Sequence, residues 1–392
     1  MKTLKRTWAD ISLDNLEYNY RSIRAHLPQG TKFLGVMKAD AYGHGAVPVS
    51  RALADLGAEY LAVSNLEEAV QIRRGEVRLP ILILGYTPAE YAANMIFLDI
   101  TQEVHSLEYA RELNEALAGT NYILNVHLKL DTGMTRIGFF AYDNERTLDE
   151  LRQVAQLSHL HIEGVFMHFC VADSRAEADV SFIKLQYKRF MDMLSAMAGV
   201  GIRPEIRHCC NSGATILYPE FALDMVRPGI ITYGNAPSDE LEGALSLRPM
   251  MSLHSMIAQV RTVPAGTDIS YGRLYRTKEE TRVAVLPIGY ADGLSRLLTG
   301  KASFYLQGHQ VPVIGRICMD MCMIDVSGVP EAKPGDVVTI FGYDDDGTLL
   351  PCERLARAQG TINYELLCQI SKRIPRICHR GAETSQILQY IV

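Results

Sequence analysis

Residues up to Tyr233 alternate between short apolar segments and helical stretches, and this alternation constrains the fold more than any other feature of the sequence. Short apolar runs bounded by turn residues are typical of strands buried on both faces. The eight strand candidates are Phe33–Met37, Tyr60–Val63, Ile81–Leu84, Phe97–Ile100, Ile123–Leu130, Ile162–Phe169, Ile206–Asn211 and Met225–Tyr233. Eight such strands separated by helices predict a (β/α)8 TIM-like barrel, whose chemistry lies at the C-terminal ends of its strands.

Several helix ends can be read directly. Asn65, followed by Glu68, is typical of a helix start at which a side chain accepts a hydrogen bond from a backbone N–H. Thr87 precedes a proline at a first helical position, which also indicates a start. Gly57 and Gly75 follow helical runs as stop signals. These signals support helices between the strand candidates.

The pattern changes after Tyr233. Residues 235–243 resemble a linker, and short β-type runs separated by turns follow them. A chain of 392 residues, 48% of them hydrophobic, is long enough for two domains. We therefore expect a barrel over residues 1–240 and a mainly β domain over residues 241–392. Residues 1–12 can contribute a strand that packs with the second domain.

Charge and cysteine content disfavour several classes of protein. The net charge of -6 is spread along the chain without a basic run, so we expect no nucleic-acid partner. No apolar segment has membrane-spanning length, and we expect a cytoplasmic protein without a membrane partner. The eight cysteines lack paired C-x-x-C spacing and are expected to be reduced. Zinc binding by His208, Cys209 and Cys210 is disfavoured because consecutive strand residues point to opposite faces, and we expect no metal.

Lys38 ends the first apolar run, where a lysine is out of place. Partial desolvation there is expected to lower the pKa of its amine, as a Schiff-base lysine requires. A lysine whose ammonium reaches solvent from a strand end is the alternative. The residues Asp40 to Gly45 place a hydroxyl and two glycines beside Lys38, as in an anion-binding loop.

Other polar residues follow the predicted strands at their C-terminal ends. They are Asp131 to Arg136 after the fifth strand, His168 at the end of the sixth, Asn211 and Ser212 after the seventh, and Arg227 to Ile230 in the eighth. Barrels often hold a phosphate with the loops after strands seven and eight. The Ser212 hydroxyl and the backbone amides of Gly229 and Ile230 are the candidates for this role.

The run Phe33 to Ala46 closely resembles the pyridoxal-phosphate lysine motif of the alanine racemase family. The resemblance extends over essentially the whole chain. Its motifs are Asp131–Gly138, Val226–Ile230, Tyr233–Gly234, Ser270–Gly272, Ile288–Gly293, Gly315–Asp320 and Thr361–Tyr364. It implies a pyridoxal 5'-phosphate enzyme with an N-terminal barrel and a C-terminal β domain. It also implies a homodimer in which each active site borrows residues from the second domain of the partner.

The resemblance assigns a role to each residue of the predicted site. Lys38 and Tyr271 are the two bases, and Lys38 also holds the cofactor. Tyr42, Ser212, Gly229, Ile230 and Tyr364 bind the phosphate, while Arg227, His168 and Asn211 complete the cofactor site. Arg136, the Met319 amide and Tyr290 are assigned to the substrate.

The implied activity is interconversion of L-alanine and D-alanine, which supplies D-alanine for peptidoglycan. Racemisation moves a proton between two faces of one carbon, so two bases serve it better than one. Arginine opposite the pyridine nitrogen cannot give up its proton, which weakens the cofactor as an electron sink and suits a racemase. A serine or broader-specificity racemase, a pyridoxal-phosphate decarboxylase and a non-catalytic cofactor carrier are the alternatives.

Lys129 lies on the same predicted strand face as His127 and Asp131, pointing into the barrel near Arg136. Two like charges about 4 Å apart repel by roughly 4 kcal/mol at an effective dielectric of 20. A neutral Lys129 or a lysine satisfied by Asp131 would relieve this repulsion. The family resemblance implies a third solution, carbamylation of Lys129, which makes the side chain an anion that holds Arg136.

Overall fold

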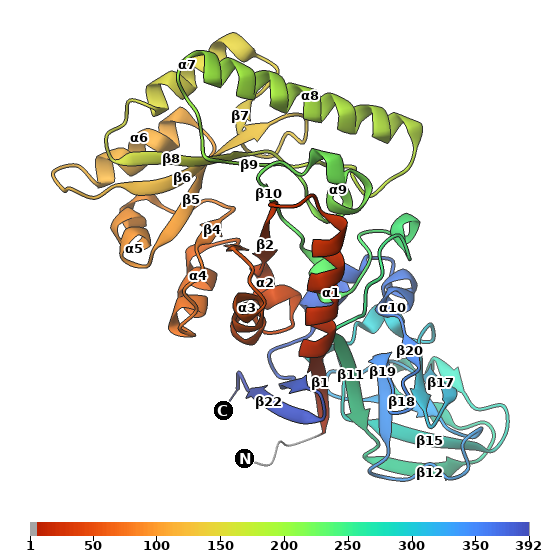
Figure 1. Ribbon diagram of the computed structural model, residues 1–392. Coiled ribbons are helices and arrows are strands. Elements are labelled where there is room, and N and C mark those ends of the chain that lie inside the picture. The colour runs from red at the N-terminus through yellow and green to blue at the C-terminus, as the bar shows by residue number, and fades with distance from the viewer. Residues whose placement is uncertain (1–5, 392) are drawn as a thin grey trace. The chain divides into compact units, whose positions relative to one another are not determined.

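The computed structural model describes residues 6–391, and the chain divides into two compact units (Figure 1). The barrel unit comprises Glu17–Ala41 and Val49–Arg248. The β unit comprises the residues up to Leu16, Tyr42–Pro48 and the chain from Pro249 onward. The predicted division after residue 240 stays a prediction.

Within residues 6–391, eight parallel strands form a nearly closed barrel, which confirms the predicted fold of the N-terminal part. In order around the barrel they are β10 (Met225–Val226), β2 (Lys32–Val36), β3 (Tyr60–Val63), β4 (Ile81–Ile83), β5 (Ile100–Val104), β6 (Leu124–Asp131), β8 (Leu160–Phe166) and β9 (Ile206–His208). Two backbone hydrogen bonds connect the segments of β9 and β10, which stand at the two ends of this order. They run from Arg227 N to Cys210 O (2.9 Å) and from Asp224 N to Arg207 O (3.0 Å). A short β7 (Phe139–Phe140) pairs with β6.

Helices surround the barrel strands in Figure 1. They are α1 (Leu13–His26), α3 (Ala46–Asp55), α4 (Leu66–Arg74), α5 (Ala92–Phe97), α6 (Leu107–Ala116), α7 (Asn144–Val154), α8 (Glu177–Gly199) and α9 (Ser212–Leu217). Asn65 caps α4 as predicted, because its side chain accepts a hydrogen bond from Glu68 N. Thr87 does not act as predicted, because Pro88 takes the N-cap position of a short 3-10 helix, η1 (Ala89–Tyr91), that has no side-chain cap.

The prediction was wrong for the fourth strand candidate. Phe97 is the last residue of α5, and β5 begins at Ile100 and continues through polar residues. Gln102 and Glu103 are fully buried there, and the Gln102 side chain donates to Gly85 O at 2.7 Å. Because the buried residues of β5 include polar side chains that form hydrogen bonds inside the protein, the sequence of this strand does not show an apolar run.

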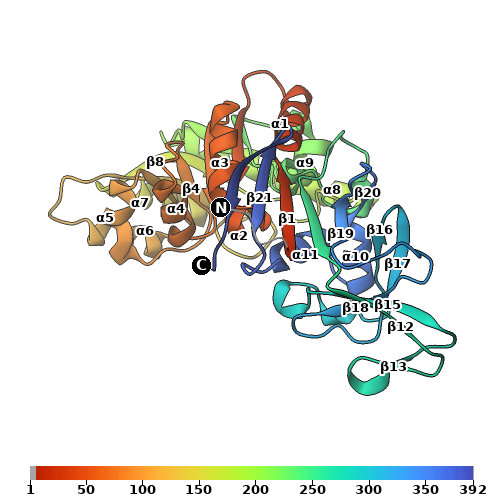
Figure 2. The same ribbon diagram turned by 90° about the horizontal axis from the view of Figure 1, so that it is seen from below.

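The second half of the chain is mainly β, as predicted. Its largest sheet has the order β12–β15–β18–β17–β16–β19–β11–β1–β21–β22, with β20 beside β19. The strands are β1 (Thr7–Ser12), β11 (Met251–Met256), β12 (Gln259–Val263), β15 (Thr281–Leu286), β16 (Ser303–Leu306), β17 (His309–Ile314), β18 (Cys322–Asp325), β19 (Val337–Tyr343), β20 (Leu349–Leu350), β21 (Arg376–Arg380) and β22 (Glu383–Leu388). The predicted N-terminal strand is β1, which pairs antiparallel with β11 and parallel with β21 (Figure 2).

Smaller elements complete the β unit. They are the hairpin of β13 (Asp268–Ile269) with β14 (Tyr275–Arg276), the helices α10 (Cys352–Gln359) and α11 (Asn363–Gln369), and the 3-10 turns η5 (Tyr271–Arg273), η6 (Tyr290–Asp292) and η7 (Arg296–Leu298). The turns η5 and η6 carry residues of the predicted site.

The segment predicted as a linker is instead part of the barrel unit. It contains a 3-10 helix, η4 (Asp239–Leu241), in which Leu241 is only 1% exposed. The Ser238 hydroxyl donates to Asp173 O at 2.5 Å, and Glu240 accepts from Arg175 N at 2.7 Å. The linker prediction was therefore wrong, because polar composition did not reveal these bonds.

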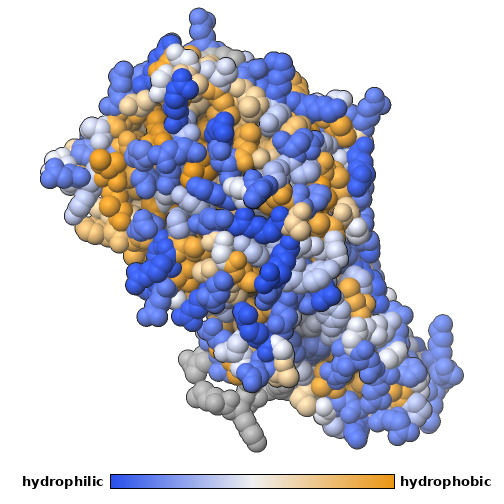
Figure 3. Space-filling model, in the orientation of Figure 1, coloured by the Kyte–Doolittle hydropathy of each residue, from blue (hydrophilic) through white to orange (hydrophobic). Residues whose placement is uncertain are grey.

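Among the described residues, no helix is long and apolar enough to span a bilayer. Hydrophilic and hydrophobic side chains are intermixed on the face shown in Figure 3. No disulfide joins the cysteines of residues 6–391.

Candidate functional site

Lys38 lies at the C-terminal end of β2, at the start of an unusual left-handed turn. Ala39, Asp40 and Ala41 have φ values of 53°, 54° and 56°, a conformation that costs L-residues about 1–2 kcal/mol each. Glu68 Oε1 accepts a hydrogen bond from Ala39 N at 2.7 Å and so stabilises the turn. Lys38 is an exposed residue, and the expected desolvation of its amine stays a prediction.

Lys129 lies inside the barrel and is only 4% exposed. Its ammonium donates to Leu130 O at 2.8 Å and lies 5.5 Å from the centre of the Phe166 ring. Burial, together with the nearby cation of Arg227, lowers the pKa of Lys129 to about 7. Among the described residues, no hydrogen bond or ion pair joins Lys129 to Asp131. The Asp131 Oδ1 atom instead accepts hydrogen bonds from backbone amides of the loop that follows β6.

Arg227 is the most deeply buried cation of the barrel's C-terminal end, with 3% exposure. Its guanidinium donates to Met167 O at 2.7 Å and to Cys209 O at 3.1 Å. It also lies 3.0 Å from His208 Nδ1 and 3.4 Å from His168 Nδ1. Burial lowers the pKa of Arg227 to about 10, so it remains charged at neutral pH.

His168 is half-buried beside this cation. Its Nε2 lies 3.4 Å from the side-chain nitrogen of Asn211, whose amide also donates to Phe169 O. Burial, followed by the charge of Arg227, holds the pKa of His168 well below its usual value. The imidazole is therefore neutral at physiological pH.

The predicted phosphate loops meet in the structure. The Ser212 hydroxyl accepts a hydrogen bond from Gly229 N at 2.8 Å. Ser212 is 6% exposed, and Ile230 begins the 3-10 helix η3 (Ile230–Tyr233) directly after Gly229. Because an accepting hydroxyl keeps its own hydrogen, Ser212 can donate to a ligand while it orients the Gly229 backbone.

Arg136 follows β6, and its side chain is exposed. The residue before it, Thr135, has φ 55° and donates its backbone N–H to Asp131 Oδ1 at 3.1 Å. The positive charge of Arg136 contributes to lowering the pKa of Lys129. This contribution is smaller than those of burial and of Arg227.

In the β unit, Tyr42 and Tyr364 form an aromatic pair whose ring centres are 6.0 Å apart. The segment that carries Tyr42 is held by Arg376, which is 1% exposed and donates to Gly43 O at 2.9 Å. Two predicted site residues thus lie together although the sequence separates them widely.

Tyr271, Met319 and Tyr290 form a second group in the β unit, and all three are exposed. Tyr271 and Met319 line a hollow of about 670 Å³ together with Ser270, Cys318, Met321 and Met323. Ser270, which has φ 65°, anchors the turn by donating its hydroxyl to Arg316 O at 2.7 Å.

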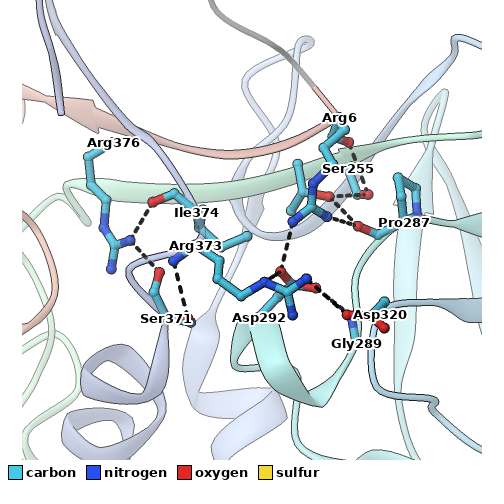
Figure 4. A network of polar contacts seen from close by, with 11 residues as sticks. Arg6, Ser255, Pro287, Gly289, Asp292, Asp320, Ser371, Arg373, Ile374 and Arg376 are labelled. Atoms are coloured by element: carbon cyan, nitrogen blue, oxygen red, sulfur yellow. Dashed lines mark hydrogen bonds and ion pairs between the residues drawn. The ribbon is translucent and has the colours of Figure 1, made fainter. Parts of the chain in front are cut away.

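A network around Asp292 fixes the loops of this second group (Figure 4). The Asp292 carboxylate is fully buried, and Arg6 donates to it at 2.9 Å. It also accepts from Gly289 N at 3.0 Å, and Arg373 pairs with Asp320 at 2.9 Å.

The loop held by Asp292 packs directly on the loop of Met319. Tyr290 N donates to Cys318 O, and Ala291 N donates to Met319 O, both at 3.0 Å. A Cβ at Gly289 would lie 2.3 Å from both of these carbonyl oxygens, so only glycine allows the approach. Asp292 therefore fixes the position of the Met319 backbone.

Known proteins resemble the chain along its whole length. The model of the alanine racemase N-terminal domain matches residues 11–237, and that of the alanine racemase C-terminal domain matches residues 250–378. The chain belongs to the alanine racemase family. This agrees with the resemblance seen in the sequence motifs.

Individual members of the family are similar over nearly full length. The alanine racemase of Desulfovibrio desulfuricans is 46% identical over 94% of this chain and 97% of its own. That of Clostridium tetani is 42% identical over 100% of both chains. The solved structure of alanine racemase from Clostridium difficile 630 has a TM-score of 0.94 at 40% identity and covers 100% of both chains. The Bacillus anthracis alanine racemase, solved with bound L-Ala-P, has a TM-score of 0.92 at 34% identity, covering 100% of this chain and 99% of its own.

Sequence reasoning missed two histidines that lie next to the predicted residues. His208 contacts Arg227 more closely than His168 does, and His127 contacts His208 at 2.8 Å. The only signal for His127 was its position on the Lys129 face of β6. His208 had been considered only as a zinc ligand, and its ring nitrogens face His127 and Arg227 instead of the cysteines.

We expect Asp292→Ala to lower the free energy of unfolding by about 1–3 kcal/mol, because it leaves the buried Gly289 N–H without its acceptor and the Arg6 guanidinium without its carboxylate partner. Thermal unfolding measures this change. Asp345→Ala, at an exposed position of the same unit, is the control and should unfold like the wild type. Equal melting temperatures for the two variants would contradict the role of the network.

Proposed function

We propose that the protein is an alanine racemase that uses pyridoxal 5'-phosphate to interconvert L-alanine and D-alanine, and so supplies D-alanine for peptidoglycan. The observation that supports this most strongly is the group of Arg227, Lys129 and the Ser212–Gly229 pair at the strand ends that also carry Lys38. Circular dichroism of an L-alanine solution tests the proposal, since racemisation removes the signal. A persistent signal with cofactor-loaded protein would reject it.

The residues present fit a phosphorylated aromatic cofactor. Ser212, Gly229 and Ile230 offer a hydroxyl and backbone amides to a phosphate, and in our proposal Tyr42 and Tyr364 add two phenol groups. Arg227 would face the pyridine nitrogen, with His168 and Asn211 behind it. A guanidinium that stays charged would leave that nitrogen unprotonated, because it can only donate.

When bound, pyridoxal phosphate withdraws electron density from the α-carbon of an amino acid and so makes its α-proton acidic. The Lys38 amine would hold the cofactor covalently and would remove or return the α-proton on one face. The phenol of Tyr271 of the partner subunit would do the same on the other face. Lys38 would act from the C-terminal end of β2, where the left-handed turn begins.

The substrate carboxylate would be bound by the Arg136 guanidinium and the Met319 amide, with Tyr290 beside them. Tyr364 would form the pocket wall. A bulky wall favours alanine over serine, so we propose alanine as the better substrate.

A homodimer with shared active sites accounts for the exposed apolar surface of the β unit. Tyr271, Leu274, Tyr290, Met319 and Met321 are 43–69% exposed. Tyr271, Met319 and Met321 line one hollow, and exposed apolar side chains gathered in this way are typical of a protein interface. In our proposal a second copy of the chain covers them and receives Tyr271.

Lys38→Ala should abolish the visible absorbance of the bound cofactor and reduce racemisation by at least roughly 10²–10⁴-fold, because one amine supplies both the covalent link and one base. An absorbance scan and the dichroism assay measure the two effects. Lys184→Ala, at an exposed position on α8, is the matched control. A retained cofactor band in Lys38→Ala would place the cofactor lysine elsewhere.

Tyr271→Phe should slow both directions by roughly 10²–10⁴-fold and leave the cofactor bound, since it removes a proton carrier and little volume. Tyr122→Phe, which removes a partly exposed hydroxyl from the barrel unit, should remain fully active. If Tyr271→Phe lost its cofactor instead, the tyrosine would have a structural role.

We also propose that carbon dioxide carbamylates Lys129. A pKa of about 7 leaves much of the amine neutral and therefore reactive at physiological pH, and the carbamate would be an anion near Arg136. Nuclear resonance with labelled bicarbonate should show a carbamate carbon that is absent in Lys129→Ala. An active wild-type enzyme without this signal would reject the modification.

A further inference from the structure

Two buried histidines, His208 and His127, connect Arg227 to the carboxylate of Glu163. His208 Nδ1 lies 3.0 Å from Arg227 Nη1, and His208 Nε2 lies 2.8 Å from His127 Nδ1. His127 Nε2 then lies 3.0 Å from Glu163 Oε2. Both histidines are 0% exposed, so water does not compete for these bonds.

The chemistry of the two ends fixes the direction of every bond between them. A guanidinium only donates, and a carboxylate only accepts. His208 must therefore accept at Nδ1 and donate from Nε2, and His127 must do the same. Burial lowers the pKa of both histidines, and the charge of Arg227 adds to this, so each is neutral with one N–H.

Glu163 is held as an ionised acceptor. Besides His127, it accepts hydrogen bonds from the Tyr60 hydroxyl at 3.0 Å and from the Thr101 hydroxyl at 3.3 Å. Burial raises the pKa of Glu163, but the bonds from His127, Tyr60 and Thr101 outweigh this and hold its pKa below the usual value. The carboxylate is thus charged at neutral pH.

The packing around the histidines leaves them no alternative position. His208 stacks on Phe166 with ring centres 4.9 Å apart, and His127 meets the His208 ring edge-on at 5.0 Å. A Cβ at Gly164 would lie 2.5 Å from the His127 ring, so the glycine makes room for it. Because the packing holds both rings in position, loss of the Glu163 acceptor would change their tautomers and not their positions.

The tautomers matter because a proton on Nδ1 of His208, instead of on Nε2, would place an N–H of His208 against an N–H of Arg227. We infer that Glu163 is a positioning residue for Arg227, and that it acts by fixing the tautomers of His127 and His208 so that His208 presents a bare Nδ1 to the guanidinium. The consequence for catalysis rests on the proposed function, in which Arg227 faces the cofactor. The tautomers themselves do not depend on it.

Nuclear resonance of ¹⁵N-labelled histidine tests the inference directly, in the protein with and without pyridoxal phosphate. In the wild type, both rings should carry the proton on Nε2 and none on Nδ1. A proton on Nδ1 of either ring would overturn the inference without any variant.

Three variants then separate the role of the acceptor from that of charge. Glu163→Leu should lose the single tautomer set, whereas Glu163→Gln should keep it because an amide oxygen still accepts. Glu205→Gln removes an exposed carboxylate just before β9 and should change nothing. Unchanged tautomers in a folded Glu163→Leu would overturn the inference.

Kinetics connect the tautomers to function. In Glu163→Leu we expect kcat to fall roughly tenfold or more with little change in KM, as for other residues that orient a functional group through a hydrogen bond. Glu163→Gln should recover most of this loss. If Glu163→Leu had altered tautomers but the kcat of the wild type, the positioning role would be rejected. If neither the wild type nor any variant racemised alanine, only the proposed function would be rejected.

Discussion

The buried positive charge of Arg227 is the constraint on which the catalytic end of the barrel depends. A guanidinium that is 3% exposed must have acceptors inside the protein, since an unpaired buried charge is strongly destabilising. Two carbonyl groups and two imidazole nitrogens supply them. Burial lowers the pKa values of His168, His208 and Lys129, and the charge of Arg227 adds to this effect in all three. Burial and one permanent cation thus act together against protonation of these groups.

Backbone strain is concentrated where the proposed nucleophile lies. The left-handed residues after Lys38 cost several kcal/mol together if each costs about 1–2 kcal/mol. Such strain persists only where surrounding contacts impose it. On the barrel side Glu68 binds Ala39 N, and in the β unit Arg376 binds Gly43 O. These bonds hold the backbone at both ends of the turn that follows Lys38.

The sequence predicted the parts of the molecule that depend on local patterns. Apolar runs located seven of the eight barrel strands, and Asn65 marked the start of α4. The eighth candidate, Met225–Tyr233, was too long, because β10 ends at Val226 and Ile230–Tyr233 is the 3-10 helix η3. The strand β5 was misplaced because its buried residues Gln102 and Glu103 look like surface residues in the sequence. The left-handed turn was not predicted, because Ala39 and Ala41 favour right-handed helices. The motifs named the residues of the proposed site, but His127 and His208 were missed because their contacts are tertiary.

The strand β6 shows how one face of a strand can serve three purposes without conflict. His127, Lys129 and Asp131 point the same way and rise by about 6.6 Å from one to the next. His127 belongs to the hydrogen-bond chain that ends at Glu163. Burial lowers the pKa of Lys129 to about 7, and Asp131 accepts the backbone N–H groups of the loop that leads to Arg136. Among the described residues no hydrogen bond joins His127, Lys129 and Asp131 to one another, so the charge at Lys129 can change while the chain through His127 and the loop at Asp131 keep their bonds. The barrel therefore separates, by depth along a single strand, the groups that hold the site in place from the group whose protonation it adjusts.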